Sequence, residues 1–403
     1  MAEPLILFDL TEFLHDAQRS GIQRVCYEMV AHWPESSRLV PACIDRRGRL
    51  VALSPDVLDL YRLFFRASKE EVPSLREKLR KTAQLGTEII TSRRFKRFRG
   101  LLNATVFSLP HQVEYYLWAA RHGLTERTFL FVHDMLPWLH PELFTAGFSV
   151  NLAPYLQCLR VLPNLSFNSA QTRDDTLLRV LRDGRPMGPV FPLGADCLGI
   201  APPRFDPARR QFAVIGTLEP RKNHRSVLDA FEPLWAAGID VELAFAGKLG
   251  WLREEDEQRI RRLQATEPRF RWLENLGDEE MIEAIRGSRA TIYPALYEGY
   301  GLPPVESLAL GVPVIATETL PCIGMLPPEG QVRLASPSPE LIRQAVLSML
   351  DDNVARRKTE EICRLPLPLW STMARGVEGW VENPKAIQER DYQRPLVPLA
   401  RAG

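Results

Sequence analysis

An alternation of short apolar segments with amphipathic ones runs along nearly the whole chain and limits what it can fold into. In the first half we expect strands at 5–10, 39–44, 104–109, 128–133, 165–168 and 189–192, and helices at 21–33, 112–122, 141–162 and 171–181. In the second half we expect strands at 212–216, 241–246, 270–273, 290–293, 312–316 and 332–335, and helices at 224–235, 252–264, 278–287, 304–310 and 339–350. Apolar strands that alternate with helices predict parallel sheets covered on both faces.

The alternation breaks once, at residues 199–208, where three prolines indicate a linker. We therefore predict an α/β protein with one Rossmann-like domain at 1–198, a second at 209–369, and a helix followed by a tail at 370–403. Two such domains facing each other leave a cleft. Because ligands of doubly wound sheets bind beyond the carboxyl ends of the strands, we expect a site there.

Composition and charge narrow the class of protein. The 403 residues carry a net charge of +1, which argues against a dedicated nucleic-acid binder. The opening apolar run is short and contains Asp9, so no signal peptide is visible, and no apolar stretch is long enough to span a bilayer. The cysteines are scattered without a CxxC pair, which favours reduced thiols in a cytoplasmic protein over disulfides or a zinc site. They are Cys26, Cys43, Cys158, Cys197, Cys322 and Cys363.

The strongest local signal is ALYEGYGLPPVESLALGVPVIAT, residues 295–317. Glycines and prolines follow an expected strand, and a short apolar helix is closed by Gly311 and Pro313. Glycines at a helix start let the backbone approach an anion, which the free N–H groups and the helix dipole favour. Glu298 lies in the loop and Glu306 in the first expected helical turn, where carboxylates suit sugar hydroxyls rather than phosphate. Either glutamate alone also fits a plain role, such as stabilising the helix dipole.

A second signal is GTLEPRKNHRSVLDAF, residues 216–231, which follows an apolar strand and opens a helix. Arg221 and Lys222 lie at the strand-to-helix turn, from which both cations can point into a ligand site. Arg can grip a phosphate with two donors, whereas Lys acts as a point charge. A solvated basic pair is the alternative, but cations are unfavourable near the positive end of a helix dipole. The pair therefore favours phosphate binding.

Together with AGKLGW at 246–251, these motifs resemble the large retaining family of GT-B glycosyltransferases often called family 4. The similarity covers residues 210–318 and points to members that transfer mannose or related GDP-sugars in bacterial surface polysaccharide assembly. The resemblance implies a hexosyltransferase that moves mannose or a related deoxyhexose with retention from a nucleotide sugar, as in O-antigen synthesis. It implies a saccharide or polyprenyl-diphosphate-linked acceptor and no cofactor.

The family's residue roles carry over to the matching positions of this chain. Arg221 and Lys222 match the pair that neutralises the donor diphosphate. Glu306 matches the glutamate that holds the ribose, and Glu298 matches the one that contacts the donor sugar. The other implied donor contacts are Gly216, Lys248, Leu249, Gly299, Tyr300, Gly301 and Leu302, with Lys248 and Leu249 expected near the nucleobase.

The first half resembles the family more weakly. Gly21 begins a helix after the first expected strand and matches a glycine loop near the donor phosphate and acceptor. FVHDMLPWLHP, residues 131–141, resembles a strand-end segment whose histidine, here His133, lies near the transferred sugar and takes part in catalysis. A structural histidine is the alternative. Asp134 is expected on the acceptor side or as an orienting group, and Trp370 resembles the start of a crossover helix that packs back on the first domain.

The chemistry follows from these parts. Negative charge grows on the leaving nucleoside diphosphate, and Arg221, Lys222 and a helix dipole are placed to stabilise it. No DxD pair offers a divalent-metal site, so we expect metal-independent transfer. No enzymic nucleophile is evident, which favours a front-face mechanism in which the leaving phosphate oxygen helps to deprotonate the acceptor. A same-fold epimerase or phosphorylase, and a non-catalytic assembly subunit, are the alternatives.

One further stretch, RRFKRFRGLL at residues 93–102, is strongly basic. Such a segment can lie on an anionic membrane surface, so we expect peripheral contact with the inner face of the plasma membrane. The phenylalanines can either insert into lipid or pack inward, and a solvated helix with an apolar stripe is the alternative. The cations are Arg93, Arg94, Lys96, Arg97 and Arg99, interleaved with Phe95 and Phe98.

Overall fold

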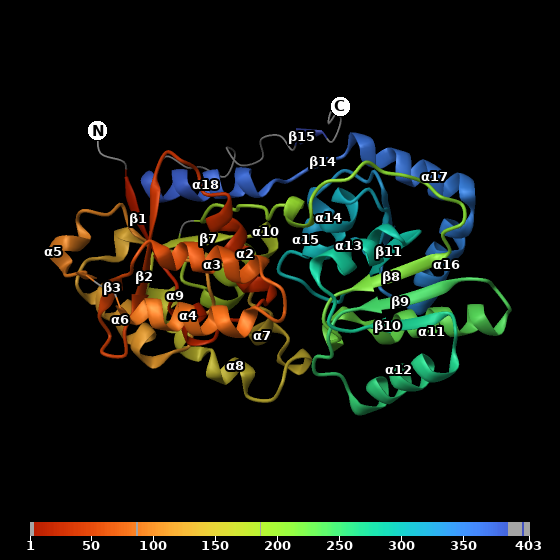
Figure 1. The fold of residues 1–403 in the computed structure, drawn as a ribbon, viewed down its shortest axis with the longest axis horizontal. Helices are drawn as coiled ribbons and strands as arrows, with labels where there is room; N and C mark the ends of the chain where they lie inside the picture. The colour runs from red at the N-terminus through yellow and green to blue at the C-terminus, as the bar shows by residue number, and fades with distance from the viewer. Residues whose placement is uncertain (1–3, 86–87, 186, 386–396, 399–403) are drawn as a thin grey trace. The chain divides into compact units, whose positions relative to one another are not determined.

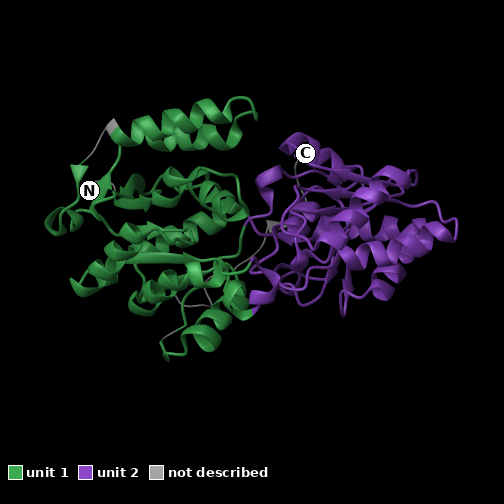
Figure 2. Cartoon of the chain, turned by 90° about the horizontal axis from the view of Figure 1, so that it is seen from below, with its two compact units in different colours: residues 1–139, 146–193, 370–394 green, residues 140–145, 194–369, 395–403 purple. Residues whose placement is uncertain are grey.

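The computed structural model describes residues 4–85, 88–185, 187–385 and 397–398. This part of the chain divides into two compact units, each with its own central sheet (Figure 2). As far as they are described, residues 1–139, 146–193 and 370–394 form the first unit, and residues 140–145, 194–369 and 395–403 form the second.

A seven-stranded sheet in the order β4-β3-β2-β1-β5-β6-β7 forms the centre of the first unit (Figure 1). From β2 to β7 all neighbouring strands are parallel, as predicted, whereas β3 and β4 add an antiparallel edge. The strands are β1 (Leu5–Asp9), β2 (Arg38–Ile44), β3 (Leu50–Ala52), β4 (Glu88–Ile89), β5 (Leu101–Asn103), β6 (Thr128–Val132) and β7 (Asn164–Phe167).

Helices surround this sheet, and the last one returns from the far end of the sequence. That helix, α18 (Trp370–Glu382), packs against α2 (Gly21–Ala31). Its Glu378 accepts hydrogen bonds from Ser36 and Ser37, which fixes it to the first unit. The other helices are α1 (Thr11–His15), α3 (Asp56–Arg66), α4 (Val72–Leu85), α5 (Ser92–Phe95), α6 (Pro110–Arg121), α7 (Leu136–Leu139), α8 (Phe148–Asn151), α9 (Ala153–Val161), α10 (Ala170–Asp174), a π-helix (Asp175–Leu181) and a 3-10 turn (Thr125–Arg127).

The second unit is built on a six-stranded, fully parallel sheet in the order β10-β9-β8-β11-β12-β13. Its strands are β8 (Gln211–Ile215), β9 (Glu242–Ala246), β10 (Phe270–Leu273), β11 (Ala290–Tyr293), β12 (Val314–Thr317) and β13 (Gln331–Leu334). Its helices are α11 (His224–Ala236), α12 (Glu254–Thr266), α13 (Asp278–Arg286), α14 (Leu302–Ala309), α15 (Pro321–Met325), α16 (Pro339–Leu350) and α17 (Asp352–Glu361). Short 3-10 turns lie at Pro141–Leu143, Asp196–Leu198, Pro220–Lys222 and Ile362–Arg364, and β14 (Pro366–Leu367) pairs with β15 (Val397–Pro398).

The predicted strand at 104–109 is wrong, because the strand lies earlier and ends at Asn103. The Asn103 Oδ1 atom accepts hydrogen bonds from the Thr105 backbone N–H (2.7 Å) and the Thr105 hydroxyl (3.0 Å). Such an Asx turn takes the backbone out of the extended conformation. Pro110 then begins α6, so the apolar residues between them cover the core without joining the sheet.

Two other predicted elements are broken up by glycine and proline. The helix expected at 141–162 is divided at Gly147, whose φ of 79° lies in the left-handed region. The strand expected at 189–192 forms only a single bridge, between Val190 and Phe167, because prolines at both of its ends lack an N–H for a ladder.

The basic stretch at 93–102 is neither a long helix nor an apolar insertion loop. It holds the end of the short helix α5 and the start of strand β5, and Phe95 and Phe98 are buried in the core of the first unit. The alternative in which these phenylalanines enter lipid is therefore wrong, and only charge remains outside. Arg94 also pairs with Glu88 at 3.0 Å, while the other four cations of the stretch are exposed.

Candidate donor-binding site

The predicted cation pair lies in a turn between β8 and α11, at the carboxyl end of the second sheet. The backbone turns at Gly216 (φ 129°), and Asn223 (φ 58°) begins α11 in the left-handed conformation. The Asn223 side chain donates to the carbonyl oxygens of Pro294 (3.3 Å) and Pro337 (3.1 Å). The turn is therefore fixed to the end of β11, the strand that precedes Glu298.

Glu298 holds both cations with one carboxylate oxygen. Its Oε1 atom lies 2.5 Å from Arg221 Nη1 and 2.5 Å from Lys222 Nζ. The Tyr293 hydroxyl donates to the same oxygen at 2.9 Å and accepts from Lys222. Arg221 is held from its other side by Glu219, with 2.6 Å between Nη2 and Oε1. We call Glu219, Arg221, Lys222, Tyr293 and Glu298 the ion-pair cluster.

The cluster is enclosed, and its charges balance. The side chains of Lys222 and Glu298 are each 9 % exposed, and that of Arg221 is 20 % exposed. Burial alone would raise the pKa of Glu298, but Arg221 and Lys222 lower it to about 2, so the carboxylate is ionised at neutral pH. Burial lowers the pKa of Lys222, and Glu298 opposes that shift. Two cations and two carboxylates thus meet at one point.

Glu306 lies near this cluster in sequence but in a separate environment. Because α14 begins at Leu302, two residues earlier than predicted, Glu306 is its fifth residue rather than part of its first turn. It is buried, at 5 % exposure, and accepts a hydrogen bond from the Cys197 thiol at 2.9 Å. The structure therefore keeps the two predicted carboxylates chemically distinct, since one faces cations and the other a thiol.

The glycine-rich loop before α14 has the expected tight backbone. Gly301 adopts a φ of 98°, and a Cβ there would lie 3.0 Å from Cys322 Sγ. Tyr300 is buried, and its carbonyl oxygen accepts from the Cys322 N–H at 3.0 Å. Gly299 and Leu302 lie on either side of Tyr300 and Gly301 in this loop. The loop backbone is therefore held by packing as well as by the conformation of glycine.

The stretch expected near the nucleobase pairs with the cation loop. Leu249 forms a bridge with Leu218, and the Lys248 carbonyl oxygen accepts from the Leu218 N–H at 2.9 Å. The Lys248 side chain is exposed, and the Leu249 N–H donates to Glu274 Oε1 at 3.5 Å. Glu274 follows β10 and was not singled out from the sequence, because a glutamate after a strand carries no signal of its own.

The predicted residues of the first unit lie in plainer surroundings. His133 is buried, and its Nε2 must carry the proton because it lies 2.6 Å from the Ala104 carbonyl oxygen, which can only accept. Burial lowers its pKa to about 4, so the ring is neutral at pH 7 and can only accept through Nδ1. The Asp134 carboxylate accepts from the Leu136 N–H at 3.1 Å at the start of α7.

Gly21 is the first residue of α2, whose N-cap is Ser20. A Cβ at Gly21 would meet no atom within 4 Å, and its φ is not positive. Nothing within the described first unit therefore requires glycine here. The position is open, as the resemblance implies, but an ordinary helix start would look the same.

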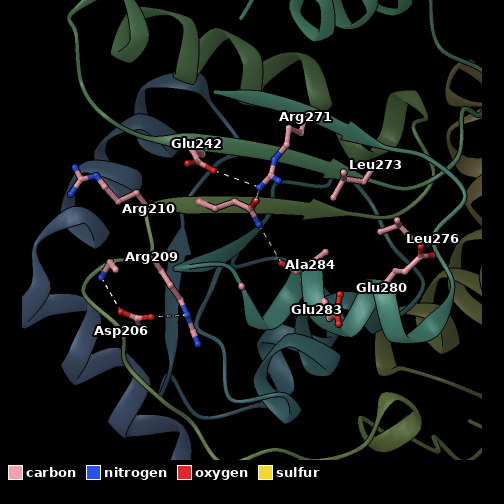
Figure 3. A pocket seen from close by; sticks show the side chains of 13 residues that line it. Asp206, Arg209, Arg210, Glu242, Arg271, Leu273, Leu276, Glu280, Glu283 and Ala284 are labelled. Carbon is pink, nitrogen blue, oxygen red and sulfur yellow. Dashed lines mark hydrogen bonds and ion pairs between the residues drawn. The ribbon is translucent and has the colours of Figure 1, made fainter. Parts of the chain in front are cut away.

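A hollow on the second unit lies elsewhere (Figure 3). It measures about 540 Å³ and is lined by Gln211 and Glu242, the first residues of β8 and β9, whereas ligands of this fold bind at the carboxyl ends. Its charged groups neutralise each other, as in the pair of Arg271 with Glu242 at 3.5 Å. We therefore place the candidate site at the ion-pair cluster and not in this hollow.

Two features are absent from the part of the chain that the structure describes. It holds no group of three or more His, Cys, Asp or Glu side chains that could bind a metal ion. Nor does any helix there have the length and apolar character needed to cross a membrane.

Comparison with known proteins assigns a family to the second unit. Residues 200–364 match the family Glycosyl transferases group 1, so the chain contains a domain of that family. The fold is GT-B: over 94 % of this chain and 99 % of its own, the structure of Anabaena Alr3699/HepE in complex with UDP and glucose superposes with a TM-score of 0.60 at 14 % identity. The predicted GT-B fold and the predicted relation to glycosyltransferases are thereby confirmed.

Two curated relatives carry the comparison further. The chain is 30 % identical over 274 residues to the serotype-specific mannosyltransferase WbdA of Escherichia coli, covering 62 % of this chain and 33 % of that protein. It is 34 % identical over 128 residues to the O-antigen chain mannosyltransferase B of Escherichia coli, covering 30 % of this chain and 32 % of that protein. The chain thus spans about a third of the length of these relatives.

Proposed function

We propose that this protein is a glycosyltransferase that moves a hexose, mannose or a related deoxyhexose, from a nucleotide sugar to a saccharide acceptor. The observation that carries the proposal is the ion-pair cluster, where Arg221 and Lys222 meet at the carboxyl end of β8 in a domain of a glycosyltransferase family. Two preorganised cations suit a diphosphate leaving group, on which charge grows as the glycosidic bond breaks. The relatives' names support mannose as the sugar.

Glu298 has a double role in this proposal. Its Oε1 atom orients the two cations, and among the described residues no hydrogen bond reaches Oε2. Since an ionised carboxylate accepts at both oxygens, Oε2 can take a hydroxyl of the donor sugar while Oε1 keeps its partners. Glu306, which belongs to another part of the domain, would take the ribose hydroxyls.

The reaction we propose is retaining and needs no metal ion or cofactor. Arg221 and Lys222 would supply the positive charge that a divalent cation supplies elsewhere. In a front-face mechanism the leaving phosphate oxygen takes the acceptor proton, so the chain's task is to hold that oxygen in place. His133 is neutral, so we assign it hydrogen bonding to a sugar rather than proton transfer.

For the nucleobase we propose guanine, so that the donor is a GDP-sugar. The supporting observation is Glu274, whose Oε1 atom lies 3.5 Å from the Leu249 N–H in the loop expected near the base. A carboxylate can accept from both the ring N–H and the exocyclic amine of guanine. Uracil does not present two adjacent donors of this kind, so a glutamate here favours GDP over UDP.

The acceptor we propose is a saccharide, free or linked to polyprenyl diphosphate, in bacterial surface polysaccharide synthesis such as O-antigen assembly. The exposed cations Arg93, Lys96, Arg97 and Arg99 support docking on the inner face of the plasma membrane, where such an acceptor would lie. Each cation near an anionic surface is worth about 1 kcal/mol. Because Phe95 and Phe98 are buried, this docking would be electrostatic only.

The experiment that tests the function is a panel of nucleotide sugars, screened first by thermal shift and then by transfer to mannose-containing oligosaccharides. A ligand that binds the folded state raises the melting temperature, so GDP-mannose should raise it more than UDP-glucose. In the Glu274→Gln variant, the difference between the melting-temperature shifts caused by GDP-mannose and by UDP-glucose should be smaller. Reversible epimerisation of the nucleotide sugar without transfer would favour the epimerase alternative, and binding without any turnover would favour an assembly subunit.

A further inference from the structure

Cys197 is half-buried, and its thiol lies against Glu306. It belongs to the 3-10 turn Asp196–Leu198, and its Sγ donates to Glu306 Oε1 at 2.9 Å. It could not be singled out from the sequence, because a scattered cysteine without a partner motif has no predicted role. Its contact is with the one carboxylate that the proposed function assigns to ribose.

Three contacts hold this turn along α14 and so fix where the thiol lies. The Ala201 N–H donates to the Ala309 carbonyl oxygen at 2.9 Å, on the C-terminal side of Cys197. Beyond it, a Cβ at Gly311 would lie 2.6 Å from Pro203 Cα, so the two backbones are in direct contact. Leu198 packs in the same apolar cluster as Leu310. These contacts hold the backbone of the turn that carries Cys197 beside Glu306.

A carboxylate that is only 5 % exposed needs hydrogen bonds, because burying an unpaired polar group is costly. The thiol supplies one of them, to Oε1, and this contact also restricts rotation of the carboxylate group. An orientation fixed in advance lowers the entropy lost when a ligand binds. The arrangement thus prepares Glu306 to accept two neighbouring hydroxyls in one geometry.

We infer that Cys197 is a positioning residue for the ribose-binding carboxylate Glu306, and that modification of its thiol closes the nucleotide site. This inference rests on the proposed function. It adds a residue that neither the family motif nor the relatives assign, and it makes the site sensitive to thiol reagents. The ligand class is the nucleoside part of a nucleoside diphosphate.

The first test is a double-mutant cycle read by calorimetric titration with GDP. Cys197→Ala should weaken GDP binding about fivefold in the wild-type background and have no further effect beside Glu306→Ala, which removes the acceptor, because coupled residues are not additive. Cys197→Ser, which restores a donor, should recover most of the affinity. Equal losses from Cys197→Ala in both backgrounds, or no loss in either, would overturn the inference.

The second test uses alkylation, in a Cys43→Ser/Cys363→Ser background that removes the other half-buried or exposed thiols. N-ethylmaleimide forms a bond between Sγ and one alkene carbon, and the thiol proton ends on the other. The adduct should abolish GDP binding, GDP should slow the labelling, and a further Cys197→Ser change should make the protein resistant. Full GDP binding by the labelled protein would contradict the inference. Unmodified wild type that binds no nucleotide would instead contradict the proposed function.

Discussion

Each unit encloses a carboxylate beyond or at the carboxyl end of one of its parallel strands, but the two carboxylates have opposite kinds of partner. In the first unit Asp9, the last residue of β1, is 1 % exposed and has only neutral donors. In the second unit Glu298, in the loop after β11, meets Arg221 and Lys222. The donors to Asp9 are the Thr11 N–H and hydroxyl, the Asn103 and Gln112 amides and the Tyr116 hydroxyl.

The difference shows which network can bind a ligand. Donors from β5, α6 and the start of α1 converge on Asp9, so this side chain connects three elements of the first unit. Both of its carboxylate oxygens already accept hydrogen bonds from these donors. The ion-pair cluster instead holds two cations whose remaining N–H groups can bind a phosphate without losing Glu298. We therefore propose that the first network is structural and the second functional.

The largest effect is expected from Lys222→Ala. Removing one of two preorganised cations should lower turnover by about 100-fold or more, because charge on the leaving diphosphate is then poorly stabilised. The measurement is kcat for sugar transfer, with circular dichroism to show that the fold survives. Lys78→Ala, at an exposed position in α4, is the control and should leave kcat unchanged. Near wild-type turnover in Lys222→Ala would refute the assignment.

Asp9→Asn should act on stability and not on nucleotide binding. The Asn side chain would place an NH2 group against donors that need an acceptor. The free energy of unfolding of the first unit should therefore fall by about 3 kcal/mol. Chemical denaturation measures this, with Asp59→Asn, whose side chain is 70 % exposed, as the control. A stable Asp9→Asn protein that has lost GDP affinity would reverse our reading of the two networks.

Substitutions of the two glutamates of the second unit should have different effects from each other, and both effects should be smaller than those above. Glu306→Ala should weaken binding of free GDP about tenfold, because the ribose loses its acceptor. Glu298→Ala should leave GDP affinity nearly intact but lower transfer, because it removes a sugar contact while both cations keep their charge and a second partner, Glu219 for Arg221 and Tyr293 for Lys222. Calorimetric titration and initial rates measure the two quantities. Similar losses of GDP affinity in both variants would undo the division of roles.

Much of the second unit could be predicted from the sequence, and less of the first. The strands at 270–273 and 290–293 were predicted to the residue, since aromatic or β-branched residues, which are enriched in strands, occur in both. The antiparallel strands β3 and β4 were missed because they are only three and two residues long, and β5 was misplaced because a side-chain turn at Asn103 ends it.

The candidate site shows the same limit. Arg221, Lys222 and Glu298 could be named because charges stand out beside glycine and proline. Their contact through a single oxygen could not be predicted, because it depends on how β8 and β11 pair. Tyr293 was missed for a simple reason: it ends an apolar strand, where a tyrosine looks like core.

A smaller effect is expected from the basic stretch of the first unit, because only its exposed charges can contact a membrane. Binding to liposomes with anionic lipid should fall when Arg93, Arg94, Lys96 and Arg97 are all changed to Ser, and it should fall with rising salt as the Debye length shortens. Co-sedimentation measures both effects. Neutral liposomes are the control and should bind little. Binding that ignores lipid charge and these substitutions would defeat the proposal.

The smallest effect is expected from removing metal ions. If Arg221 and Lys222 take the place of a divalent cation, transfer in excess EDTA should stay within about twofold of the untreated rate. The rate of sugar transfer with and without the chelator measures this. Complete loss of transfer in EDTA, with recovery on adding manganese or magnesium, would show that the ion-pair cluster cannot replace a divalent cation.

The most direct test of the central claim compares GDP with guanosine on the wild type and on Lys222→Ala by calorimetric titration. If the ion-pair cluster holds the donor diphosphate, the wild type should bind GDP at least about tenfold more tightly than guanosine, because charge-assisted hydrogen bonds are strong. Lys222→Ala should lose most of that difference while its affinity for guanosine stays the same. An undiminished preference for GDP in the variant would contradict the account, because the diphosphate would then be bound elsewhere.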